Sequence, residues 1–292
     1  MRINICMAFD NNYAKYAGVT IASILSNALD DEILNFFILD DDITEENKQK
    51  ISDLQKIKNF NITYVTIDKD MFEDYKKIKT HKYISLATYY RLKLCQLIPN
   101  IDKIIYLDCD IVVNSSLKEL WLTDMYNTPI AGVKDLCFDK SNFSTYVNAG
   151  MLLMNLEYIC NNNIEDKYLE YARKNSDLIT CGDQEIINAV LNGKIKILNN
   201  CWNVQVANVF TMSSRISRPS IIHYIGSNKP WMKNSWTWYK EYYYEYLRLT
   251  SWFEEDSNRY SWLILENIIG FICLLIYKSF QVVKSKLKTL LF

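Results

Sequence analysis

The first 110 residues alternate short apolar runs with amphipathic segments, and this alternation restricts the possible fold more than any other feature. Apolar, β-branched runs predict strands over residues 3–9, 34–39, 61–67 and 103–107. Helical spacing of apolar residues, or a helix-starting residue, predicts helices over 16–27, after Thr44 and over 88–98. Strands that alternate with helices indicate a mainly parallel sheet covered by helices on both faces.

Two aspartates directly follow the strand expected over 103–107. Asp108 and Asp110 are one residue apart, so their side chains project to the same side. Ligands of open α/β sheets bind beyond the carboxyl ends of strands, and Asp10 follows the first strand at that same edge. Paired carboxylates repel each other unless a cation lies between them, and oxygen ligands suit Mg²⁺ or Mn²⁺. The pattern indicates a metal site, with two solvated turn acids as the alternative.

His223 is one of only two histidines in the chain and ends an apolar strand expected over 221–224. Its imidazole would be a third ligand, one that suits Mn²⁺ better than Mg²⁺, whereas a purely structural histidine is the alternative. Gly226 would let the backbone approach a phosphate closely, and Lys229 would supply a compact positive charge. His81 lies in a lysine-rich stretch and is expected at the surface.

Six short blocks of the sequence, in register, resemble glycosyltransferase family 8, which includes bacterial lipopolysaccharide galactosyl- and glucosyltransferases and glycogenin. The blocks cover residues 8–13, 88–94, 105–110, 147–155, 182–184 and 223–231. The resemblance implies an α/β GT-A fold over residues 1–240, with a Rossmann-like, mainly parallel central sheet flanked by helices. Residues 241–292 would form a helical, basic and apolar C-terminal region. The resemblance also implies a retaining enzyme that uses a UDP-sugar and Mn²⁺.

The resemblance further implies roles for individual residues. The metal ligands would be Asp108, Asp110 and His223. The residues that bind UDP would be Asp10, Asn11, Asn12, Tyr13, Gly226 and Lys229, with the Tyr13 ring stacked on uracil. The residues around the donor sugar would be Arg91, Asn148, Asp183 and Gln184. Asp183 and Gln184 are the catalytic candidates, but an amide is a weak nucleophile, so attack on the same face of the sugar is favoured over a covalent intermediate.

The predicted function is transfer of galactose or glucose from a UDP-sugar to a cell-surface glycan or a lipid-linked saccharide, with Mn²⁺ as cofactor and Mg²⁺ as its substitute. One alternative is a non-catalytic relative that binds UDP-sugars. The other is a haloacid-dehalogenase-like phosphatase, whose first motif resembles residues 107–112 but whose later acidic pair is missing from 182–187. The net charge of −1 argues against a nucleic-acid partner.

The C-terminal region differs in charge from the rest of the chain, because five basic residues and one acid follow Ser257. Its apolar run over 268–277 is shorter than the ~20 residues that a membrane-spanning helix needs. Contact with a membrane surface is therefore expected, and packing against protein is the alternative. Scattered cysteines without a CxxC pair and an N-terminus without a secretory signal predict reduced thiols and a cytoplasmic protein, peripheral on the inner face of the cell membrane.

Overall fold

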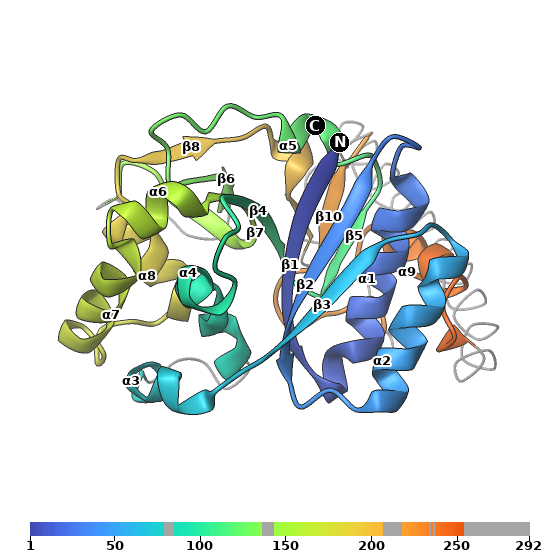
Figure 1. Ribbon diagram of the computed structural model, residues 1–292, viewed down its shortest axis with the longest axis horizontal. Coiled ribbons are helices and arrows are strands. Elements are labelled where there is room, and N and C mark those ends of the chain that lie inside the picture. Colours follow the sequence, from blue (N-terminus) through green and yellow to red (C-terminus); the bar gives the residue numbers. More distant parts are fainter. Residues whose placement is uncertain (79–84, 136–142, 207–217, 234, 236, 254–292) are drawn as a thin grey trace, which may run out of the picture. The chain divides into compact units, whose positions relative to one another are not determined.

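The computed structural model describes residues 1–78, 85–135, 143–206, 218–233, 235 and 237–253. A seven-stranded sheet has the order β3-β2-β1-β4-β7-β6-β8, and a three-stranded sheet has the order β5-β10-β9 (Figure 1). The strands are β1 Arg2–Asp10, β2 Ile33–Asp41, β3 Asn61–Thr66, β4 Lys103–Leu107, β5 Ile111–Val113, β6 Ile130–Lys134, β7 Val147–Asn155, β8 Ile195–Ile197, β9 Val204–Gln205 and β10 Ile221–His223. The α-helices are α1 Ala14–Asn27, α2 Glu45–Ser52, α3 Glu73–Lys76, α4 Leu94–Leu97, α5 Lys118–Trp121, α6 Leu156–Asn161, α7 Ile164–Lys174, α8 Gly182–Val190 and α9 Lys240–Leu247. The 3₁₀ helices are η1 Asn11–Tyr13, η2 Asp53–Lys56, η3 Lys69–Phe72, η4 Leu86–Lys93 and η5 Asn200–Trp202.

The large sheet is mixed but mainly parallel. Strand β1 runs parallel to both β2 and β4, and β2 runs parallel to β3. Strand β7 is inserted antiparallel between β4 and β6. The predicted mainly parallel sheet is therefore confirmed, and the short strands β5, β6 and β9 are additions that the apolar pattern did not reveal.

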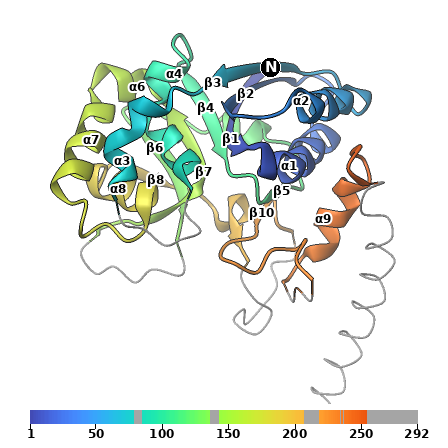
Figure 2. The same ribbon diagram turned by 90° about the horizontal axis from the view of Figure 1, so that it is seen from below.

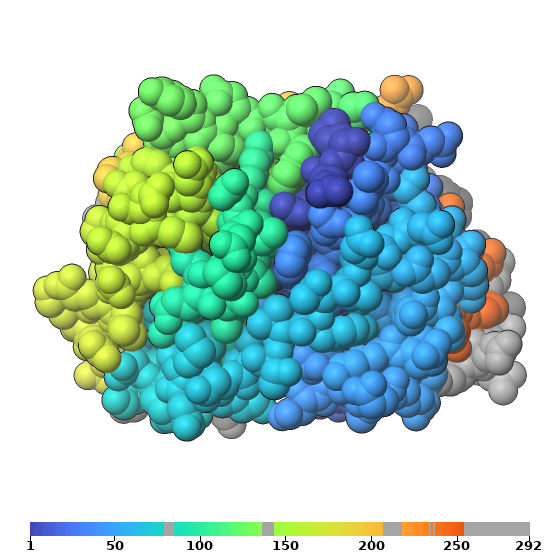
Figure 3. Space-filling model, in the orientation of Figure 1, coloured from blue at the N-terminus to red at the C-terminus, as the bar shows by residue number. Residues whose placement is uncertain are grey.

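Helices cover both faces of the large sheet, and the side chains of β1 show why. Successive side chains of a strand point to opposite faces. Cys6 packs into the cluster formed with η4, α7 and α8, whereas its neighbours Ile5 and Met7 are buried on the opposite face, where α1 contacts β1. Figures 1 and 2 show α1 and α2 on one side of β1 and β4, and α6 to α8 on the other side. Figure 3 shows the segment from η3 to α4, in cyan and teal, between these two groups.

Local sequence signals explain where several helices begin and end. Thr44 has an extended backbone, and its hydroxyl accepts a hydrogen bond from the Asn47 amide, so it caps α2 as predicted. The helix predicted over 88–98 instead consists of the 3₁₀ helix η4 and the short helix α4. Lys93 separates the two, because its φ of −131° and ψ of 30° lie outside the helical region.

The chain divides into two compact units, Met1–Thr250 and Ser251–Phe292. Helix α9 belongs to the first unit, where the Tyr246 hydroxyl accepts a hydrogen bond from the Asn27 side chain of α1. His81 and the segment 254–292 lie outside the described residues, so the surface position of His81 and the membrane contact of the tail stay predictions. The boundary expected at residue 240 also stays a prediction. Within the described residues, no helix is long and apolar enough to span a bilayer.

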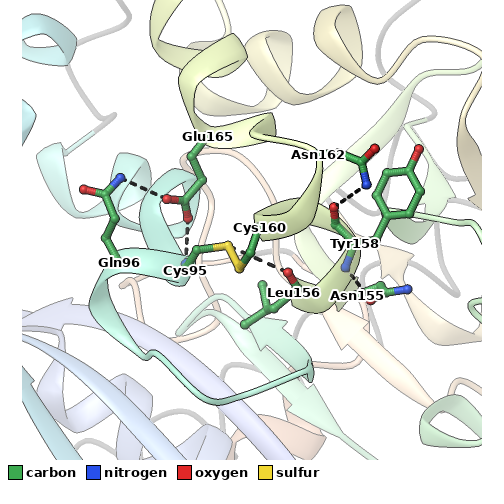
Figure 4. The surroundings of a disulfide bond; sticks show 8 residues. All are labelled: Cys95, Gln96, Asn155, Leu156, Tyr158, Cys160, Asn162 and Glu165. Carbon is green, nitrogen blue, oxygen red and sulfur yellow. Dashed lines mark hydrogen bonds between the residues drawn. A yellow bond between two sulfur atoms is a disulfide. The ribbon is translucent and has the colours of Figure 1, made fainter.

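A disulfide joins Cys95 of α4 to Cys160 of α6 (Figure 4). The prediction that the cysteines are reduced is therefore wrong for this pair. The two helices hold the Cα atoms 5.8 Å apart, within the range that a disulfide can bridge. Glu165 of α7 accepts hydrogen bonds from the Cys95 amide and the Gln96 side chain, and burial raises the pKa of its carboxyl. Since disulfides are rare in the cytosol, cysteine chemistry does not support the predicted cytoplasmic location.

Candidate active site

A cavity of about 450 Å³ opens at the carboxyl ends of β1 and β4. Ligands bind in this position in open α/β sheets. The segments that line it come from β1 and η1, from η4, from the turn after β4, from the start of β7, from the first turn of α8 and from the loop after β10. Most of the predicted site residues line it, namely Asp10, Tyr13, Arg91, Asp108, Asp110, Asn148, Asp183, Gln184, His223, Gly226 and Lys229.

Strand pairing brings the two aspartates and the histidine together. Strand β10 pairs antiparallel with β5, which sets His223 opposite Ile111 and next to Asp110. Ligand atoms of Asp108, Asp110 and His223 all lie within 4.8 Å of one another. The imidazole Nε2 is 3.2 Å from Asp110 Oδ1 and 3.9 Å from Asp108 Oδ2. The sequence prediction that these three side chains converge is thus met by the geometry.

The donor set fits a divalent cation. Two carboxylates and one imidazole suit Mn²⁺, and Asp110 Oδ1 is buried without a hydrogen bond from the described residues. The antiparallel pairing of β7 with β4 places Gly150 beside Asp108, whose amide donates to the Gly150 carbonyl at 2.8 Å. A Cβ at Gly150 would lie 2.2 Å from His223 Cε1 and 2.7 Å from Asp108 Oδ2. Glycine therefore leaves the space in which the three ligands meet.

Lys229 supplies a positive charge at the same place. Its ammonium group donates hydrogen bonds to Asp110 Oδ2 and, at 2.6 Å, to the Tyr224 carbonyl. Burial opposes ionisation of Asp110, but the ammonium group of Lys229 prevails and holds the pKa of that carboxyl well below its usual range. Gly226, with a φ of 70°, forms part of the loop that carries Lys229 past the cavity.

Arg91 connects the candidate metal ligand Asp108 to Asp183 of α8. Its side chain is 3% exposed, and its guanidinium donates to Asp108 Oδ1 at 2.7 Å and forms an ion pair with Asp183 Oδ2 at 3.1 Å. Burial raises the pKa of the Asp183 carboxyl to about 6, although the nearby guanidinium acts in the opposite direction. Arg91 therefore lines the cavity and also bridges two of its acids, Asp108 and Asp183.

The side-chain amide of Gln184 is held by hydrogen bonds at both ends. Its Oε1 accepts from the Ala149 amide at 3.0 Å and from Asn148 Nδ2 at 3.2 Å. Its Nε2 donates to Asp135 Oδ2 at 2.9 Å. Sequence reasoning missed Asp135, because no motif or spacing connects it to Gln184 before β6 and β7 are paired.

The turn after β1 lines another part of the cavity. Asp10 Oδ1 accepts a hydrogen bond from the Tyr13 amide at 3.0 Å, and Asp10 Oδ2 accepts from Asn12 Nδ2 at 3.2 Å. The Tyr13 ring is 43% exposed, lines the cavity and packs edge-on against Tyr16. Such a ring is available for stacking on a planar ligand.

Asn11 and Asn12 are placed differently from the other predicted residues. Neither is among the described residues that line the cavity. Asn11 Oδ1 accepts hydrogen bonds from the amide and hydroxyl of Thr44 and from Asn47 Nδ2, at 3.0, 2.9 and 2.8 Å. The contact of both residues with UDP stays a prediction, and for Asn11 the geometry favours an indirect role in holding η1 against α2.

Asn203 is a second residue that sequence reasoning missed. It is 2% exposed, ends η5 and contacts both His223 and Asn148. Asn203 lies next to the candidate ligand His223 because β9 pairs with β10, and no local pattern in residues 199–206 reveals this pairing.

The chain matches the sequence model of glycosyl transferase family 8 over residues 4–235. It is 35% identical over 246 residues to a putative glycosyltransferase of Haemophilus influenzae, a match that covers 79% of this chain and 73% of that protein. It is 28% identical to a lipopolysaccharide 1,3-galactosyltransferase of Salmonella typhimurium, over 80% of this chain and 74% of that protein. The crystal structure of galactosyltransferase LgtC with donor and acceptor sugar analogues has a TM-score of 0.75 and 28% identity, and the match covers 85% of this chain and 96% of LgtC.

These similarities agree with the six blocks recognised in the sequence and with the GT-A architecture of the sheet. The phosphatase alternative is excluded, because the matched segment includes the aspartate pair and most of the first unit. The family match extends over most of the chain, from β1 to beyond Lys229. The chain therefore belongs to glycosyltransferase family 8.

Proposed function

We propose that the enzyme transfers galactose or glucose from a UDP-sugar to a saccharide acceptor of a cell-surface glycan or lipid-linked saccharide, with retention of anomeric configuration and with Mn²⁺. The observation that carries this proposal is the convergence of Asp108, Asp110 and His223 next to Lys229 on one cavity wall. The Salmonella relative acts on lipopolysaccharide by its name, which supports an acceptor of this class.

Each end of the cavity suits a different part of the donor. Tyr13 offers a ring on which uracil stacks, and Lys229 offers a cation for the diphosphate. Asp108, Asp110 and His223 would hold the Mn²⁺ ion, which supplies Lewis-acid stabilisation of the diphosphate. Mg²⁺ would substitute with lower affinity, because the imidazole ligand favours Mn²⁺.

The reaction replaces the bond between the anomeric carbon and a β-phosphate oxygen. The acceptor hydroxyl oxygen forms the new bond to this carbon on the same face, the bond to the phosphate breaks, and the hydroxyl proton passes to the departing phosphate oxygen. Lys229 would meet the negative charge that develops on UDP. Arg91, Asn148 and Asp183 would orient the sugar, and Gln184 would present its fixed amide to the reacting face.

The proposal is tested by UDP release from a panel of UDP-sugars in the presence of Mn²⁺ or EDTA. UDP-glucose or UDP-galactose should be turned over with Mn²⁺, and EDTA should abolish the activity. Asp110→Asn keeps the side-chain volume but removes the ligand charge, so we expect a loss of ~100-fold or more. Asp31→Asn is the matched control, because Asp31 forms an exposed ion pair with Lys118 and does not line the cavity.

Two results would contradict the proposal. A normal rate for Asp110→Asn would remove the metal role of the aspartate pair. Binding of UDP-sugars without turnover of any of them would favour the alternative of a non-catalytic relative.

Membrane contact of the basic C-terminal segment and a location on the inner face of the cell membrane complete the proposal, and this location requires the Cys95–Cys160 disulfide to persist in a reducing compartment. The supporting observation is the excess of basic residues after Ser257. Co-sedimentation of the full chain with anionic vesicles tests it, and replacement of Lys284, Lys286 and Lys288 by glutamine should weaken the binding. Binding that is unchanged by these substitutions would contradict a charge-driven contact.

A further inference from the structure

A buried asparagine lies directly behind the candidate metal ligands. Asn203 Oδ1 is 3.1 Å from Nδ1 of His223, on the side of the imidazole that faces away from the aspartates. Asn203 Nδ2 donates to Asn148 Oδ1 at 3.0 Å. One side-chain amide thus contacts a candidate metal ligand with one end and a candidate donor-sugar residue with the other.

A main-chain amide determines which way these side chains are oriented. The Gly150 amide can only donate, and it donates to the side chain of Asn148 at 3.1 Å, so this acceptor must be Oδ1 of Asn148. The same oxygen accepts from Asn203, so Asn203 must present its NH₂ group there. Asn203 then presents its oxygen to His223, and Nδ1 of the imidazole must carry a proton to donate to it.

The proton at Nδ1 has a consequence for the other ring nitrogen. A neutral imidazole with a proton on Nδ1 has its lone pair on Nε2, and Nε2 is the atom that faces Asp110 and Asp108. A partner of this kind at the outer nitrogen fixes the tautomer and the ring orientation of metal-binding histidines in general.

We propose that Asn203 is a positioning residue for the transfer reaction. It holds His223 with Nε2 directed at the divalent cation, and through Asn148 it couples the cation site to the part of the cavity that orients the donor sugar. This inference rests on the proposed function, because it requires that Asp108, Asp110 and His223 bind a cation.

The local structure makes this role more specific than general packing. Strand β9, which begins directly after Asn203, runs parallel to β10 and pairs Gln205 with His223. The backbone of Asn203 is therefore held next to β10 whatever its side chain is. A substitution at residue 203 removes the amide contacts while the β9–β10 pairing that positions the histidine backbone is retained.

The first experiment measures Mn²⁺ affinity without turnover, from the electron paramagnetic resonance signal of free Mn²⁺ in the presence of UDP. Asn203→Leu removes both amide contacts at similar volume, and we expect Mn²⁺ to bind 10- to 100-fold more weakly than in the wild type. Asn155→Leu is the matched control. It also loses two hydrogen bonds, to the Tyr158 amide and the Met125 carbonyl, but at the opposite end of β7. Its Mn²⁺ affinity should equal that of the wild type.

The conservative variant Asn203→Asp separates the two contacts and also serves if the leucine variant does not fold. A carboxylate still accepts from Nδ1 of His223 but cannot donate to Asn148. We expect Mn²⁺ affinity within about threefold of the wild type, and a loss of about tenfold in kcat for UDP release with an unchanged Mn²⁺ requirement.

The outcomes separate this inference from the proposed function. If the wild type does not bind Mn²⁺, the proposed function fails and this inference fails with it. If the wild type binds Mn²⁺ and Asn203→Leu binds it equally well, only the inference is overturned. Equal weakening in Asn155→Leu, or an Asn203→Asp variant as weak as Asn203→Leu, would also overturn it.

Discussion

The two ends of the cavity are constructed in different ways. At the part of the cavity where we propose that uridine binds, called here the uridine end, Asp10 and Tyr13 belong to one turn. The side chain of Asp10 accepts a hydrogen bond from the amide of Tyr13. At the other part, called the metal end, the candidate ligands come from the turn after β4 and from β10, which are more than a hundred residues apart in the chain. The first end is a local motif, and the second is a product of strand pairing.

This difference determines how each end responds to substitution. At the uridine end, both side-chain hydrogen bonds of Asp10 stay within its own turn, so we expect a substitution there to have a local effect. At the metal end, Asp108 contacts Arg91 and lies against Gly150, while His223 contacts Asn203. A change in one of these residues shifts several groups, so we expect larger and less additive effects there.

The largest expected effect is that of Gly150→Ala. The new methyl group would lie 2.2 Å from His223 Cε1 and 2.7 Å from Asp108 Oδ2, so the imidazole and the carboxylate cannot both keep their positions. We expect Mn²⁺-dependent UDP release to fall by ~100-fold or more, because at least one preorganised contact is lost. Enzyme kinetics and Mn²⁺ titration measure the effect.

Gly193→Ala is the control for loss of a glycine as such. Gly193 has a φ of 80°, so alanine there should cost about 1 kcal/mol of stability, but nothing closer than 3.8 Å meets its methyl group and the residue does not line the cavity. Equal losses of activity in the two variants would contradict the explanation that contacts with His223 and Asp108 cause the Gly150→Ala effect.

The same difference explains what could be predicted from the sequence. Strand β4 was predicted to the residue and α2 was predicted from Thr44, because both depend on patterns within a few residues. Asp135 and Asn203 could not be found in this way, since each acquires its role from a residue on another strand or helix. The disulfide was missed for the same reason, because 65 residues separate its cysteines.

An intermediate effect is expected for the pH dependence of stability, through Asp183 next to Arg91. The folded pKa of Asp183 is about 6, above its ordinary value of 3.8, so the folded chain binds this proton more tightly than the unfolded chain does. The resulting stability is fully present below pH 3.8 and is lost as the pH rises through about 6. The contribution is on the order of 3 kcal/mol, at about 1.4 kcal/mol for each unit by which the two pKa values differ.

Asp183→Asn removes this titration at constant side-chain volume. The free energy of unfolding of the wild type should therefore decrease more between pH 4 and pH 7.5 than that of the variant, and urea denaturation at the two pH values measures both. The same pH dependence in both proteins would contradict a raised pKa of Asp183. The ion pair with Arg91 would then keep this carboxylate ionised between pH 4 and pH 7.5.

The smallest effects are expected at the uridine end, where Tyr13 and Asn11 provide an internal comparison. Tyr13→Ala removes a ring that lines the cavity, and loss of base stacking should weaken UDP binding about tenfold, within the usual ~1–3 kcal/mol per base. Asn11→Ala should change UDP affinity by less than about twofold, because its oxygen is already bonded to Thr44 and Asn47, and should instead cost about 1 kcal/mol of stability.

Isothermal titration with UDP and Mn²⁺ measures the affinity of each variant, and thermal denaturation measures its stability. An affinity loss in Asn11→Ala as large as in Tyr13→Ala would mean that Asn11 contacts UDP directly.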